Sequence, residues 1–250
     1  MSDKNVYEWN PYGTNEGLPL GSQVAGKDIR EDIFRLGLPI DKAYDRWLQH
    51  KGVQSALKGT HNSARKEFTD EIKRTIEWMK HKPPLQYESS NSREDLEKFD
   101  VMNLSLSVPF GNEKVIQILE KICPNDYETF PIKLHTSTGV SDKYYLINIA
   151  HVIHDAVDKN ISKYKLWFDK SEGDENSIRF IDRLLFKENC MGDKLLGRIH
   201  EDLGRPMINK KVMDVFYENN IKGISYDPLE DNINGRFTDN YMPDGVTLKY

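Results

Sequence analysis

Apolar residues recur every three or four positions in five parts of the chain, which is the spacing typical of amphipathic helices. The longest such pattern covers residues 62–80 and ends before Pro83-Pro84, because proline cannot continue a helix. The same spacing predicts helices from Asp41 to about Leu48, after Gly111-Asn112, and over residues 209–219.

Short apolar or alternating runs predict β-strands between these helices. The stretch from Lys143 to Asp158 is the predicted centre of the fold. In it an apolar strand, residues 144–149, runs into a helical pattern formed by Val152, Ile153, Ala156 and Val157. The remaining strand candidates are residues 104–108, 130–136, 164–168, 178–186, 195–199 and 224–226.

Together these elements predict an α+β fold with a mixed, mainly antiparallel sheet and packed helices, preceded by a smaller helical N-terminal region. Residues 1–28 hold four glycines and scattered aromatic residues, and we expect an extended arm that docks on the body. The polar run ESSNSRED at residues 88–95 predicts a boundary. It divides the chain into residues 1–95, the arm plus helical region, and residues 96–250, the α+β domain.

Composition and charge narrow the class of protein. Charged residues make up 30% of the 250 residues, no apolar run approaches membrane-spanning length, and no signal peptide is evident, so we expect a cytoplasmic protein without a membrane partner. The whole net charge of -5 falls in residues 99–250, which hold 19 Lys and Arg against 24 Asp and Glu. An acidic surface attracts a basic protein and disfavours nucleic acid.

Two sets of histidines are the candidates for catalysis. His151 and His154, with Asp155 and Asp158, could converge on a metal in a hydrolase, and His50, His61 and His81 could serve a nuclease. Neither set is complete, because the additional ligands such enzymes need are missing from the sequence. No nucleophile elbow or glycine-rich phosphate loop is present, so we expect no catalytic residue, metal or cofactor, and the pattern favours a binding protein.

Four segments resemble the immunity-protein family eleven of bacterial polymorphic toxin systems, over about residues 100–230. They are SVPFGNEKVIQILEKICPNDYETFPIKL, KYYLINIAHVIHDAVDKNIS, LLGRIHEDLGRPMINKKVMDVFYENN and IKGISYDP. The first 95 residues lie outside this resemblance. Part of them is faintly similar to the trailing half of an HNH nuclease toxin domain, but the leading histidine pair of that domain is missing here. The family resemblance implies a bacterial protein that neutralises a cognate toxin effector by forming a stoichiometric complex.

The acidic loop after residue 168 is the predicted toxin contact. Asp169, Glu172, Asp174 and Glu175 lie close together in the sequence, just after Trp167, and could attract a toxin with a basic surface. A solvated loop without a partner is the alternative for the same residues.

Overall fold

The computed structural model of the chain describes most of the central part of the sequence. The described residues are 6–8, 18–19, 37–49, 70, 73–103, 108–166, 178–183, 185–200 and 202–224. The predicted contact residues Trp167, Asp169, Glu172, Asp174 and Glu175 lie outside them, as do His50 and His61.

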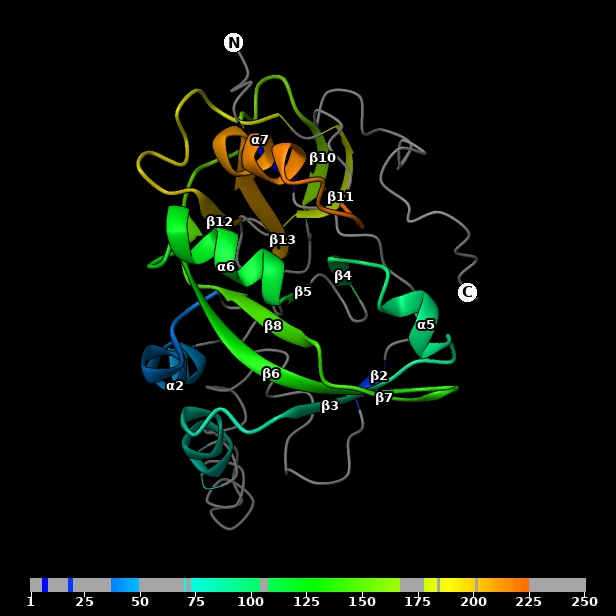
Figure 1. Cartoon of the computed structure of the whole chain (residues 1–250). Coiled ribbons are helices and arrows are strands. Elements are labelled where there is room, and N and C mark those ends of the chain that lie inside the picture. The colour runs from blue at the N-terminus through cyan, green and yellow to red at the C-terminus, as the bar shows by residue number, and fades with distance from the viewer. Residues whose placement is uncertain are drawn as a thin grey trace.

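The largest sheet has seven strands, and only one pair in it is parallel (Figure 1). Its order is β2-β3-β6-β8-β5-β4, and β7 pairs with the far end of β6. The strands are β2 (Leu18–Pro19), β3 (Leu85–Glu88), β4 (Val101–Asn103), β5 (Pro109–Asn112), β6 (Tyr127–Thr136), β7 (Gly139–Ser141) and β8 (Tyr144–Ile149).

The remaining described strands form two smaller sheets. One has the order β1-β13-β12-β9, in which β12 and β9 are parallel; the other is the antiparallel pair β10-β11. Their strands are β1 (Val6–Glu8), β9 (Val152–Ile153), β10 (Lys163–Leu166), β11 (Ile178–Arg183), β12 (Leu196–Ile199) and β13 (Asp202–Asn209).

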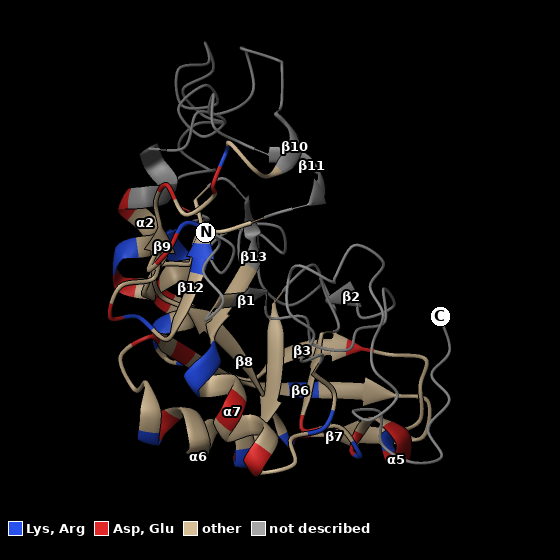
Figure 2. Ribbon diagram, turned by 90° about the horizontal axis from the view of Figure 1, so that it is seen from above, with Lys and Arg blue, Asp and Glu red and all other residues tan. Residues whose placement is uncertain are grey.

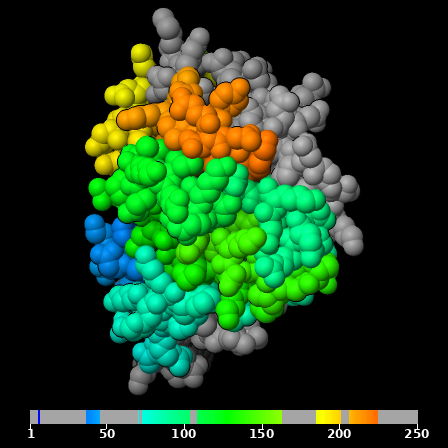
Figure 3. Space-filling view, viewed as in Figure 1, coloured from blue at the N-terminus to red at the C-terminus, as the bar shows by residue number. Residues whose placement is uncertain are grey.

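Helices cover both faces of the seven-stranded sheet. On one face α2 (Ile40–Gln49) and the helix at residues 73–80 pack on alternate residues of β6, among them Phe130, Ile132 and Leu134. On the other face α6 (Glu113–Ile122) and α7 (Lys210–Glu218) lie side by side and bury Tyr127, Ile147 and Ile149 (Figure 3). A short helix, α5 (Arg93–Leu96), lies beside β7.

Most of the predicted elements are confirmed, and the fold is α+β with mainly antiparallel pairing. The strands predicted at 130–136 and 144–149 correspond to β6 and β8, which form an antiparallel pair. The helices predicted after residue 111 and at 209–219 correspond to α6 and α7. Each begins at an asparagine cap, because Asn112 accepts a hydrogen bond from Val115 N and Asn209 accepts one from Lys211 N. None of the described helices is long and apolar enough to cross a membrane.

The helix predicted directly after Ile149 is wrong. Residues 152–153 form β9, parallel to β12, and a turn follows in which Asp155 has a φ of 55°. Ile153, Ala156 and Val157 are buried in a third core cluster against the four-stranded sheet. Their spacing therefore reflects burial around a turn, since short apolar runs fit a strand and a helix equally well.

The predictions for the N-terminal half are tested in part. The arm contributes β1 and β2, which pair with β13 and β3 and so dock on two different sheets. Of the helix predicted at 62–80, residue 70 and residues 73–80 are described and helical. The division of the chain at residue 95 stays a prediction.

Candidate functional site

The acidic loop falls between two strands that pair with each other. β10 ends at Leu166 and β11 begins at Ile178, and these two residues are partners in the antiparallel register. The chain therefore returns to the same place on either side of residues 167–177, although the side chains of the predicted contact residues lie outside the described part.

The histidines and aspartates of the predicted metal site have separate partners. His151 Nε2 lies 3.1 Å from Asp126 Oδ1, Asp155 accepts a hydrogen bond from Lys187, and the His154 ring lies 4.5 Å from the His200 ring. Among the residues that the structure describes, no three His, Cys, Asp or Glu side chains gather in a way that could hold a metal ion. His81, from the other set, is exposed beside Glu77.

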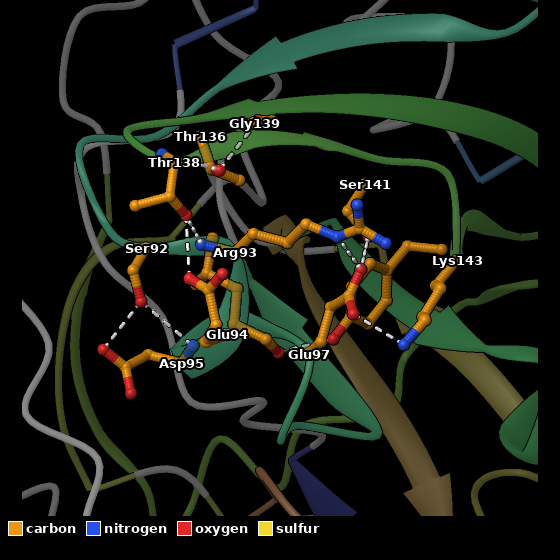
Figure 4. Close-up of polar contacts among 12 residues, drawn as sticks. Ser92, Arg93, Glu94, Asp95, Glu97, Thr136, Thr138, Gly139, Ser141 and Lys143 are labelled. Carbon is orange, nitrogen blue, oxygen red and sulfur yellow. Dashed lines mark hydrogen bonds and ion pairs between the residues drawn. The ribbon is translucent and has the colours of Figure 1, made fainter.

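The densest group of polar contacts joins α5 to the β6–β7 hairpin, and Glu97 is at its centre (Figure 4). One Glu97 oxygen accepts hydrogen bonds from Arg93 Nε and Ser141 Oγ, both at 2.7 Å, and the other accepts one from Lys143 Nζ at 2.6 Å. Burial alone would raise the pKa of Glu97, but these three donors outweigh it and lower the pKa to about 2.

The turn of the hairpin is held by a second set of contacts. Thr138 Oγ1 accepts from Arg93 N at 2.9 Å and donates to Glu94 at 2.8 Å, while Thr136 donates to the Gly139 carbonyl. Ser92 caps the first turn of α5 through Asp95 N. A four-residue helix has little stability of its own, so these contacts fix both α5 and the hairpin.

A buried polar junction ties α2 to the opposite end of the sheet. Asn148 is fully buried, and its Nδ2 donates to the Leu38 carbonyl and to Glu128. Glu128 also accepts from Ile40 N at 3.0 Å, at the start of α2. Burial is the main cause that raises the pKa of Glu128. This junction orients α2.

Asp126 forms a third polar junction, which holds the four-stranded sheet. Its Oδ2 accepts hydrogen bonds from Leu195 N at 2.7 Å and Leu196 N at 3.1 Å, where β12 begins. Its Oδ1 is the atom that faces His151. The carboxylate thus joins residues about seventy positions apart and is used for structure rather than for chemistry.

Sequence reasoning missed the three polar groups centred on Glu97, Glu128 and Asp126. One local signal was present, since Ser92 and Asp95 have the spacing of a helix-capping pair. Glu97, Glu128 and Asp126 give no such signal, because their partners come from distant segments.

The fold and these contacts define an α+β protein whose described polar groups hydrogen-bond to one another and join distant segments of the chain. The family model described as "Immunity protein family (Imm11)" matches residues 39–231, so the chain belongs to this family of immunity proteins. The match begins well before residue 100 and includes α2 and β3, which the resemblance in the sequence left out. No curated protein matches the sequence.

Proposed function

We propose that this chain is an immunity protein that binds a cognate bacterial toxin and neutralises it in a one-to-one complex, in the cytoplasm of the cell that makes both. The observation that supports it is the family match, which covers α6, α7 and the strands of the seven-stranded sheet other than β2. The protein acts by binding and not by catalysis, since neither histidine set has a complete group of ligands in its sequence or among its described residues.

We further propose that the acidic loop contacts a basic surface of the toxin through Trp167, Asp169, Glu172, Asp174 and Glu175. The pairing of Leu166 with Ile178 supports this, because it brings the two ends of the loop together as in a hairpin. Four carboxylates in such a loop would speed association with a cationic surface and slow dissociation.

The first experiment co-expresses the protein with each toxin domain encoded beside its gene, and scores growth rescue and one-to-one co-purification. Rescue with a stable complex is the expected result; failure with every neighbouring toxin contradicts the proposal. Neutralising the four acids together, as Asp→Asn and Glu→Gln, should then weaken binding by well over about tenfold. An unchanged affinity would remove the loop from the interface without affecting the proposed function.

A further inference from the structure

None of the described helices lies over one half of a face of the seven-stranded sheet. The face on which α6 packs is buried near Tyr127, Ile147 and Ile149, because α6 lies mainly over β5 and β8. Toward the hairpin end, the residues on the same face are exposed or half-buried. We call this part the open face; its residues are Gln86, Glu88, Lys133, His135, Val140 and Tyr145.

Strand register shows that these residues form one continuous layer. Glu88, His135 and Val140 are direct partners across β3, β6 and β7. Gln86 is the partner of Lys133, and its Oε1 lies 2.9 Å from His135 Nε2. Cross-strand partners on one face have touching side chains, so the open face is flat and contiguous.

The core fixes the layer from beneath. Alternate residues of the same strands, including Tyr87, Ile132 and Leu134, are buried in the first core cluster. The hairpin is further held by the contacts of Glu97 and Thr138. Binding to this face therefore requires little ordering of the backbone, which favours affinity.

The side chains of the open face suit a protein partner. Val140, with 44% of its surface exposed, is one of three large exposed apolar residues in the described part of the chain. Tyr145 is half-buried, and its hydroxyl is hydrogen-bonded to Glu113. Tyrosine and aliphatic side chains within a polar rim are typical of protein interfaces.

Charge indicates the kind of partner. The face and its rim hold the carboxylates of Glu88, Glu113 and Asp142 against the exposed Lys133. The nearby cations Lys143 and Arg93 both pair with Glu97, and Arg93 also lies near Glu94, so these two cations and two carboxylates offset each other. Glu113 is the first residue of α6, and its neighbour Lys114 pairs with Asp100 at 3.5 Å. Elsewhere α6 and α7 carry both acidic and basic residues (Figure 2). The excess of negative charge at the open face complements a cationic protein surface.

We infer that the open face docks against a basic surface of the cognate toxin. The inference rests on the proposed function and adds to it a second contact, on a part of the fold distant in sequence from the acidic loop. A toxin held by both would contact a rigid sheet and the end of the β10–β11 pair.

The test replaces both ends of one cross-strand row with lysine, as Glu88→Lys with Val140→Lys. Both side chains are exposed, so the melting temperature should stay within about 2 °C of the unmodified protein. Affinity for the cognate toxin, measured by calorimetry with the full chain, should fall about 100-fold or more. The control, Ile161→Lys with Tyr217→Lys, changes the other two exposed apolar residues of the described part, adding two positive charges where the test variant adds three, and should alter affinity less than about threefold.

The outcomes separate the two proposals. If the unmodified protein binds its toxin and the Glu88→Lys, Val140→Lys variant binds equally well, the open face is not the interface while the immunity function stands. If the control loses affinity as much as the test variant, added positive charge anywhere is the cause and the inference fails. If the protein alone forms a dimer that the test variant abolishes, a second copy is the occupant. If no toxin binds the unmodified protein, the proposed function itself is contradicted.

Discussion

Replacing Glu97 by glutamine removes one negative charge from the centre of the α5–hairpin contacts and keeps the shape of the side chain. Glu97 is only 14% exposed, and it accepts hydrogen bonds from two cations and one hydroxyl. In the variant an amide NH₂ or a neutral carbonyl faces Lys143 or Arg93, so at least one charge-assisted hydrogen bond is lost.

The size of the effect follows from the pKa. A shift of the Glu97 pKa from 4.5 to about 2 corresponds to at most about 3.4 kcal/mol of stabilisation, at about 1.36 kcal/mol for each pKa unit. The partners Arg93 and Lys143 are 43% and 55% exposed, so water screens both ion pairs. After this discount we expect a loss of about 1–2 kcal/mol at pH 7.

The dependence on pH tests the cause. The folded state lowers the pKa of Glu97, so its contribution is present above the unfolded value of about 4.5 and is lost as pH falls toward 2. The difference in free energy of unfolding between the protein and its Glu97→Gln variant, from urea titrations, should therefore shrink by more than half between pH 7 and pH 3. Glu94→Gln, an exposed change on the same helix that keeps an oxygen to accept the Thr138 hydrogen bond, should cost less than about 0.5 kcal/mol. A difference that stays constant from pH 7 to pH 3 would refute the electrostatic explanation.

Three further changes test other parts of the fold. Gly223→Ala should lower the free energy of unfolding, measured by thermal unfolding, by about 3 kcal/mol or more, because Gly223 has a φ of +93° and a Cβ there would overlap the Val101 carbonyl. The control Gly192→Ala, also at positive φ but in open space, should lower it by only about 1 kcal/mol. Glu128→Gln should leave stability unchanged or raise it by up to about 1 kcal/mol at pH 7, with no gain at pH 4. The reason is that folding raises the pKa of Glu128, so its charged form destabilises the fold at higher pH. A marked loss of stability at pH 7 would contradict this. Asn112→Ala should cost about 1 kcal/mol and speed amide exchange in the first turn of α6, whereas unchanged exchange would show that the cap is dispensable.

The sequence was most informative where the structure is local. The helical periodicity of α6 and α7 is visible in the residues themselves, and so are their asparagine caps. β6 was also predictable, because Phe130, Ile132 and Leu134 alternate with polar or smaller residues.

Features that depend on distant segments could not be predicted in this way. The alternation in β6 shows that two faces exist, but the extent of the open face depends on where α6 lies. Ile153, Ala156 and Val157 have helical spacing and yet surround a turn, because the smaller sheet supplies their neighbours. Asn148 lies in an apolar run, and its burial depends on the Leu38 carbonyl and Glu128, which accept hydrogen bonds from its Nδ2.

The pairing of β1 with β13 affects the order in which the protein can be completed. Val6 is the register partner of Asn209, so the first described strand to leave the ribosome must wait for one of the last. Asp126 likewise finds its partners only when residues 195 and 196 have been made. During synthesis the seven-stranded sheet can assemble from its own segments before β13 is made. The four-stranded sheet closes late and over a long separation in sequence, and we expect this closure to slow folding.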